Sequence, residues 1–213
     1  MKLISFLLIT LLFGTKIYSQ DSNKVYHTDK PFVGTIDYTF INFLASNITD
    51  TKAIAKQISQ FRAKEYIINN IIGDSKGKDI KFETESLASD DSGGLITIAF
   101  NCDEVDKRGL LLAFFGDNKN QNGEISKAFG FRSIPLADAQ KLFNKLSDLK
   151  EKNAKYLSSD NNVNNVYIEF EDIKFVIYRD GDSLIRVFWN GFEVVWESTA
   201  FNRSGRRLNR WFE

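Results

Sequence analysis

The dipeptide Asn190-Gly191, which lies between two runs of alternating apolar residues, constrains the fold of this chain more than any other feature of its sequence. Asn-Gly in this setting is the strongest hairpin signal that a short segment can carry. With these two residues as the loop, the strands over about 183–189 and 192–198 pair in a single register. One face pairs Trp189 with Phe192, Val187 with Val194 and Ile185 with Trp196, and the other pairs Phe188 with Glu193, Arg186 with Val195 and Leu184 with Glu197. The first face is an apolar core stripe, and the second is mixed, with Arg186 diagonal to both glutamates.

Two amphipathic helices separate the other predicted strands. The first helix, over about 50–72, has apolar residues at helical spacing and a C-terminal glycine, namely Ile54, Ile58, Phe61, Ile68, Ile72 and Gly73. The second helix opens at Pro135, and its apolar face consists of Leu136, Ala139, Leu142, Phe143, Leu146, Leu149 and Tyr156. Strands are predicted over 32–42, 79–87, 94–101, 109–116 and 124–132, and over 166–171 and 173–179 ahead of the hairpin.

This pattern predicts the α+β class, with antiparallel sheets and the order strand, helix, four strands, helix, four strands. A helix followed by four strands occurs twice, so a duplicated unit is a hypothesis, and it fails if the two units differ in strand order. We therefore expect one compact, two-lobed domain, with a first unit over 31–133 and a second unit over 134–213. Residues 20–30 are polar and are predicted to be a flexible N-terminal segment.

Residues 1–19 have the pattern of a secretory signal peptide. A positive Lys2 precedes an apolar run over 3–13, and the small residue Ser19 stands where cleavage would leave Gln20 as the new N-terminus. The run is too short to cross a bilayer, which takes about 20 apolar residues, and no later apolar run reaches that length. The sequence therefore predicts an exported protein, periplasmic or extracellular, with no transmembrane segment in the mature chain.

The scarcity of cysteine and histidine argues against several classes of exported protein. Cys102 is the only cysteine, so the chain forms no intramolecular disulfide, and the leader ends without a cysteine that could carry a lipid anchor. We expect Cys102 to be a buried thiol at a strand end. His27 is the only histidine, and the chain has no G-x-S-x-G or H-E-x-x-H motif. Histidine-based hydrolysis and histidine-rich zinc sites are therefore disfavoured.

Two pairs of carboxylates are candidates for acid–base catalysis. Glu169 and Glu171 alternate with apolar residues, which places both on one face of a strand, and Asp180 and Asp182 flank Gly181. Both pairs also have an ordinary structural interpretation, because half-exposed strands carry acids and tight turns favour Asp next to Gly.

The loop over 118–125 has the spacing of a calcium loop but not its chemistry. Its ligand positions are neutral Asn residues, and Phe129 stands where a bidentate Glu is needed. A hairpin loop is therefore predicted there, and neither a metal site nor a cofactor is predicted in the chain.

The C-terminus is the one segment with a local charge bias. Its basic residues, interleaved with apolar and aromatic ones, are Arg203, Arg206, Arg207 and Arg210, next to Trp211. Arginine beside aromatic residues suits an anionic partner, such as a lipid head group, a polysaccharide or an acidic protein surface. The alternative is a short terminal helix that docks Leu208, Trp211 and Phe212 on the sheet and leaves the arginines in solvent.

The leading functional prediction is a secreted or periplasmic, non-catalytic module that binds a protein, an envelope component or a small ligand. It rests on predicted export and on the absence of a usual catalytic set. The leader holds two of the 28 basic residues and none of the 28 acidic ones, so the mature chain is nearly balanced in charge and a nucleic-acid partner is not expected. The alternative is a carboxylate-dependent hydrolase of an envelope or extracellular substrate, in which at least two of the four candidate acids would converge in a cleft.

Overall fold

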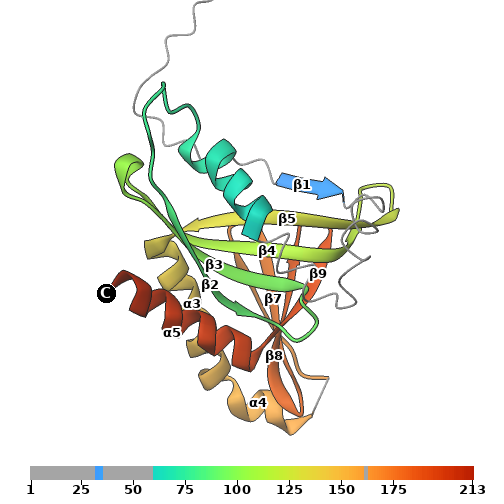
Figure 1. Cartoon of the computed structure of the whole chain (residues 1–213). Helices are drawn as coiled ribbons and strands as arrows, with labels where there is room; N and C mark the ends of the chain where they lie inside the picture. Colours follow the sequence, from blue (N-terminus) through green and yellow to red (C-terminus); the bar gives the residue numbers. More distant parts are fainter. Residues whose placement is uncertain (1–31, 36–59, 161–162) are drawn as a thin grey trace, which may run out of the picture.

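The computed structural model describes residues 32–35, 60–160 and 163–213, and within them nine strands form one antiparallel sheet flanked by helices (Figure 1). In chain order the elements are β1 (Phe32–Thr35), η1 (Ile67–Ile72), β2 (Glu83–Ser89), β3 (Leu95–Cys102), η2 (Asp103–Val105), β4 (Lys107–Lys119), β5 (Ile125–Pro135), α3 (Leu136–Lys152), α4 (Ala154–Ser159), β6 (Val166–Phe170), β7 (Ile173–Asp180), β8 (Asp182–Trp189), β9 (Phe192–Glu197) and α5 (Ser198–Phe212). The predicted α+β class with an antiparallel sheet is confirmed. The predicted leader, the segment over 20–30, and parts of the first predicted strand and helix lie outside the described residues.

The sheet consists of two meanders that meet at one point. β2, β3, β4 and β5 pair antiparallel in chain order, and β6, β7, β8 and β9 do the same. β4 joins β9 where Asn118 pairs with Phe192, and β1 adds to the free side of β5. α3 packs chiefly against β4 and β5, which belong to the preceding unit. The two sets of four strands thus share a pairing order, but the helix of the second unit packs on strands of the first. The duplicated unit stays a prediction.

The hairpin register predicted around Asn190-Gly191 is confirmed in all six pairs. Both loop residues have positive φ, at 44° and 84°, which is the type I′ geometry that Asn-Gly favours. The same turn joins the meanders, because the Lys119 N–H donates to the Gly191 carbonyl at 2.9 Å and Asn118 Nδ2 donates to the Asn190 carbonyl at 2.8 Å. A Cβ at Gly191 would lie 2.3 Å from the Lys119 carbonyl oxygen, so this approach requires glycine.

Strands β3, β4 and β5 of the first meander have buried residues on both faces, whereas the second meander is buried on one. Alternate residues of β4 point into opposite cores. They are Leu110, Leu112 and Phe114 on one side and Leu111, Ala113 and Phe115 on the other. The first core, which we call the helix-side core, contains the apolar stripe of β8 and β9 together with buried residues of α3 and α5. The second core, which we call the N-terminal core, lies between the first meander and the helix over 60–72 (Figure 1).

The first predicted helix is observed over 60–72 and ends, as predicted, at Gly73. Residues 60–66 are α-helical, and η1 continues as a π-helical turn whose last bond runs from the Gly73 N–H to the Ile68 carbonyl at 2.9 Å. Its buried residues are Ala63, Tyr66 and Ile67. Phe61 and Ile68, two of the apolar residues at helical spacing, are 73% and 47% exposed. Apolar residues occupy more than one face of this helix, and the sheet covers only one of them.

The second predicted helix begins at Leu136, directly after Pro135. Its buried residues in α3 are Ala139, Leu142, Phe143 and Leu146. The helix is interrupted at Asn153, which separates α3 from α4. Leu157 lies 11 residues, or about three turns, after Leu146 and therefore on the same face, and it is buried. The predicted burial of Tyr156 is wrong, since half of its surface is exposed. Within the described ranges, no helix has the length and apolar character needed to span a membrane.

Candidate functional site

The last helix, α5, presents four arginines to solvent. Arg203, Arg206, Arg207 and Arg210 are spaced three and four residues apart, which places them on one face of the helix. All four are exposed, and α5 contains no acidic residue. We call these four residues the α5 arginine stripe. It extends about 10 Å along the helix axis, since each residue rises about 1.5 Å.

The opposite face of α5 holds the stripe in place. The buried residues of that face are Ala200, Phe201, Ser204 and Leu208. The Phe201 ring packs edge-on against Trp196, with centroids 5.1 Å apart, and Ser204 Oγ lies 2.7 Å from Thr97 Oγ of β3. A Cβ at Gly205 would lie 3.2 Å from the Phe143 ring, so α5 and α3 pack closely. The arginines therefore project from a firmly docked helix.

Arg207 differs from the other members of the stripe because it also supports the sheet. Its Nη1 donates to the Leu87 carbonyl at 2.8 Å and to the Ser86 carbonyl at 3.3 Å. These carbonyls belong to β2, an edge strand that carries a bulge at this point. The side chains of Arg203, Arg206 and Arg210 make no hydrogen bond or ion pair with another described residue, so their guanidinium groups are available to a partner.

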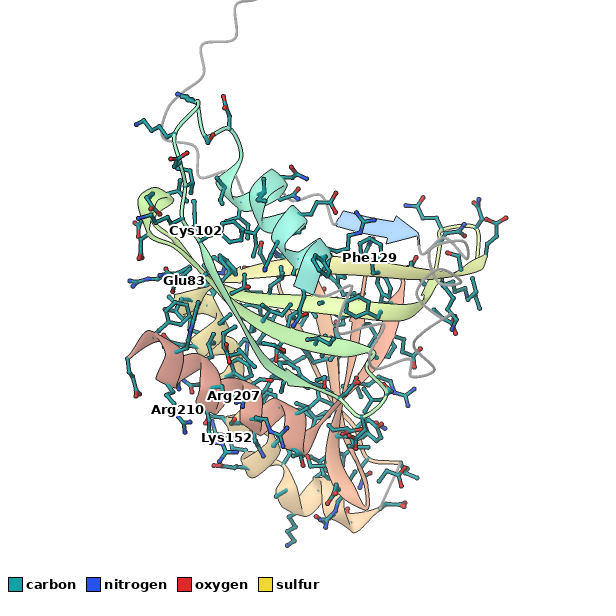
Figure 2. The ribbon with its side chains drawn as sticks, in the orientation of Figure 1. Glu83, Cys102, Phe129, Lys152, Arg207 and Arg210 are labelled. Atoms are coloured by element: carbon teal, nitrogen blue, oxygen red, sulfur yellow. The ribbon has the colours of Figure 1, made fainter. Side chains whose placement is uncertain are left out.

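The neighbouring helices extend the positive surface. α3, α4 and α5 together carry nine basic and three acidic side chains, although the whole chain has a formal charge of zero. α3 lies beside α5, where Gln140 Nε2 donates to Asn209 Oδ1 at 3.3 Å. Figure 2 shows Lys152 of α3 on the same side of the molecule as Arg207 and Arg210. An excess of basic charge is therefore concentrated on the helical layer.

Lys150 is a basic residue of this layer that the sequence pattern did not single out. Its Nζ donates to Ser198 Oγ at 3.0 Å and lies 5.1 Å from the centroid of the Phe201 ring. Burial lowers the pKa of this ammonium group. Ser198 Oγ in turn donates to the Ser183 carbonyl, so these contacts tie α3, the start of α5 and β8 together. Only the tertiary packing brings these residues together, and nothing local in the sequence signals it.

Trp211 ends the stripe as a partly buried aromatic residue. Trp211 and Phe212 pack against the helix-side core, and their rings meet edge-on with centroids 4.7 Å apart. Leu208 is fully buried. The structure therefore has the docked terminal helix described as the alternative above, with its arginines in solvent, and the same docking leaves Trp211 directly beside Arg210.

The four candidate acids form two pairs, one near the β6–β7 turn and the other at the β7–β8 turn. Glu169 points outward from β6 and accepts a hydrogen bond from the Tyr167 hydroxyl at 3.1 Å, and Glu171 lies in the turn between β6 and β7. Asp180 and Asp182 pair with each other at the far end of β7. The eight residues of β7 separate the two ends by about 23 Å at about 3.3 Å per residue. The fold does not bring the two pairs of acids together.

A polar network at the β6–β7 turn joins the two meanders. Arg132 of β5 forms an ion pair with Glu171, and its Nε donates to Asp172 Oδ1 at 2.8 Å. Trp189 Nε1 donates to Asp172 Oδ2 at 2.8 Å. Burial raises the pKa of Asp172, but the hydrogen bonds from Arg132 and Trp189 outweigh it and lower the pKa overall. The lowered pKa keeps the Asp172 carboxylate ionised, which suits a structural contact better than a proton donor.

The calcium-like loop and the single cysteine have structural roles. Asn120 Oδ1 accepts from the backbone N–H groups of Asn122 and Glu124 at 3.0 and 2.9 Å, so the loop uses this oxygen to close its own turn. In the portion of the chain that the structure describes, no group of three His, Cys, Asp or Glu residues could hold a metal ion. Cys102 is a buried free thiol at the end of β3, and burial, with Glu104 and Asp103 nearby, raises its pKa to about 11. A thiol with this pKa is unreactive near neutral pH.

Comparison with known proteins adds no relative. No protein-family model matches the chain, and neither a curated protein nor a solved structure matches it. The case for a function therefore rests on the geometry and chemistry of the chain itself.

Proposed function

We propose that the protein is an exported, non-catalytic module that binds an anionic component of the cell envelope through the α5 arginine stripe. The observation that carries the proposal is the exposure of Arg203, Arg206 and Arg210 on one face of a docked helix, with no ion pair to a described residue. Guanidinium groups bind phosphates and carboxylates through paired, charge-assisted hydrogen bonds. Because the charges are spread along about 10 Å of helix, they suit a partner that presents several negative groups rather than one.

The position of Trp211 supports a surface as the partner. A partly buried tryptophan at the end of a row of arginines can contact the boundary between polar head groups and apolar material, where aromatic side chains are favoured. Lys152 and the other basic residues of α3 widen the area that such a surface would meet.

The arrangement of the acids favours binding over hydrolysis. A carboxylate-dependent hydrolase needs two acids on either side of one bond, with different pKa values. Glu171 is paired with Arg132, and Asp180 and Asp182 lie at the other end of β7. This geometry supports the non-catalytic module.

Export is part of the proposal and has its own test. The support is the pattern over residues 1–19, with cleavage after Ser19. We expect the protein recovered from the periplasm or the medium to begin at Gln20 when its N-terminus is determined by mass spectrometry. Recovery of the uncleaved chain from the cytoplasm would contradict this part.

The binding proposal is tested with vesicles of phosphatidylcholine, prepared with and without phosphatidylglycerol. We expect the mature chain to sediment with the anionic vesicles alone. Because each basic residue near an anionic lipid surface contributes about 1 kcal/mol, the triple variant Arg203→Glu, Arg206→Glu, Arg210→Glu should bind about a hundredfold or more weakly.

A matched control changes the same number of charges elsewhere. Lys76, Lys78 and Lys81 are exposed on the connection that precedes β2, and their replacement by Glu alters net charge equally. This control should retain most of the binding, whereas an equal loss in both variants would contradict a site on α5. Polygalacturonate serves as a competitor, and binding to it without binding to vesicles would identify a polysaccharide, rather than lipid head groups, as the anionic partner.

We also propose that the two helix-plus-meander units arose by duplication. The support is the shared chain-order pairing of β2 to β5 and of β6 to β9. Homologues of this chain should then show residue-level similarity between 50–132 and 135–198. Its absence from a deep alignment would contradict the proposal.

A further inference from the structure

The sheet ends in edge strands that differ in how well they are protected. An edge strand exposes unpaired backbone N–H and C=O groups, and proteins usually block such edges with bulges, charges or covering side chains. β2 has all three devices, since it carries a bulge after Ser86, Arg207 bonds its carbonyls, and Glu83 and Glu85 lie along it.

β6 has none of these protections apart from one acid. Its sequence Val-Tyr-Ile-Glu-Phe contains no Lys, Pro or Gly, and all five residues pair with β7 in regular register. Among the described residues, no side chain donates to or accepts from its backbone. β-Branched and aromatic residues of this kind pair readily with another strand.

The helix-side core is left open along β6. Val166, Ile168 and Phe170 point toward this core but are only partly buried. The residues of β7 that face the same way, Ile173, Phe175 and Ile177, are fully buried. Beside this edge, Val163 and Tyr167 are 65% and 58% exposed. A further strand next to β6 would cover apolar surface that the monomer leaves in water.

The free backbone groups of β6 belong to alternate residues. β6 and β7 are joined by a two-residue turn, and the flanking pair of Phe170 and Ile173 closes it. In an antiparallel hairpin of this kind the closing pair exchanges both hydrogen bonds, and bonded pairs alternate with unbonded ones. The N–H and C=O groups of Tyr167 and Glu169 therefore point away from β7, toward a potential partner strand.

We propose that β6 pairs antiparallel with β6 of a second copy of this chain, so that two sheets form one continuous sheet about a twofold axis at Ile168. This register uses all five residues of β6 and the outward backbone groups of Tyr167 and Glu169. It places each Glu169 opposite Tyr167 of the other copy, and in the monomer Tyr167 already donates to Glu169 at 3.1 Å. No like charges face each other, as the pairing of strands requires, and the twofold contact closes on itself. The proposal is independent of the α5 arginine stripe.

The test measures the mass of the mature chain in solution by light scattering and sedimentation over about a thousandfold range of concentration. We expect a concentration-dependent dimer. Tyr167→Glu should shift the apparent dissociation constant about tenfold or more toward monomer, because two pairs of glutamates then face each other. Glu169→Lys creates no like-charge pair across the axis, because each introduced lysine faces Tyr167, so this variant serves as the partner in a mixing experiment.

Mixing Tyr167→Glu with Glu169→Lys should restore a dimer containing one copy of each, since the introduced glutamate of one copy would then face the introduced lysine of the other across the axis. Glu83→Lys on β2 is the matched control and should leave the dimer unchanged. A monomer at every concentration would overturn the proposal. So would a dimer that Tyr167→Glu leaves intact while its circular dichroism and unfolding midpoint match those of the wild type.

Discussion

The two meanders of this protein differ in how many of their faces are covered, and the difference explains how their sequences look. β3 and β4 lie between two cores and contain long apolar runs, Leu95 to Phe100, broken by the buried Thr97, and Leu110 to Phe115. β8 and β9 bury one face, so burial alternates along them, with buried Val187 next to partly exposed Phe188. A strand buried on both faces loses the period of two that marks a half-buried strand.

The largest expected effect is a loss of stability, and it is compared between two neighbouring residues within each meander. Leu111→Ala and Leu112→Ala should each destabilise the protein by about 2–5 kcal/mol, because each opens a cavity in a different core. Val187→Ala should cost about 1–3 kcal/mol, whereas Phe188→Ala, on the partly exposed face, should cost less than Val187→Ala. Urea unfolding of the four variants gives the comparison. Equal losses at Val187 and Phe188 would show that the outer face of the second meander is covered in solution.

The next effect concerns the turn that joins the meanders. Gly191 has positive φ and also lies against the Lys119 carbonyl, whereas Gly181 has positive φ with nothing within 4 Å of an added Cβ. Gly191→Ala should therefore cost about 2 kcal/mol or more, and Gly181→Ala about 1 kcal/mol, since only the first adds a collision to the backbone strain. The difference in thermal unfolding midpoint between the two variants measures how much the close contact between Gly191 and the Lys119 carbonyl contributes to stability. A larger loss at Gly181 would contradict it.

The smallest expected effect is a contrast in pH dependence between one acid of each meander. In the first meander, burial raises the pKa of Asp90, although Ser92 Oγ and the Leu95 N–H bond its carboxylate. In the second, hydrogen bonds from Arg132 and Trp189 outweigh burial and lower the pKa of Asp172. The two acids should therefore affect stability in opposite directions as the pH changes.

For Asp90, the native state binds the proton more tightly than the unfolded chain, so its contribution falls as the pH rises from about 3.9 through the raised native pKa. For Asp172, the contribution is present above about 3.9 and is lost as the pH falls through the lowered native pKa. The free energy of unfolding of the wild type minus that of Asp90→Asn should decline with rising pH, and the same difference for Asp172→Asn should decline with falling pH. Slopes of the same sign would contradict the pairing of Asp172 with Arg132.

The same comparison shows which parts of the structure the sequence could predict. The Asn190-Gly191 hairpin could be derived residue by residue, including the contact between Arg186 and Glu193, whose atoms lie 2.6 Å apart. Its information is local, because a two-residue turn and one buried face determine the register. The face of the helix over 60–72 could not be derived, because Phe61 and Ile68 are as apolar as the buried Ile67.

The residue types of the candidate site could be predicted from the sequence, but the long-range contacts around it could not. The spacing of the four arginines follows from the sequence, and so does a terminal helix. That Arg207 bonds the bulge of β2, 120 residues away from it in sequence, does not. The network of Arg132, Asp172 and Trp189 does not follow from the sequence either, since its members come from β5, a turn and β8. Long-range polar contacts of this kind depend on how the two meanders meet.

The most direct test of the binding site is an alanine series along the α5 arginine stripe, measured as affinity for phosphatidylglycerol vesicles and as thermal midpoint. Arg203→Ala, Arg206→Ala and Arg210→Ala should each weaken binding about fivefold with an unchanged midpoint, because none has a partner within the described structure. Arg207→Ala should also lower the midpoint, because the β2 carbonyls lose their donor. Full binding by the folded triple variant lacking Arg203, Arg206 and Arg210 would contradict the assignment of the site to α5.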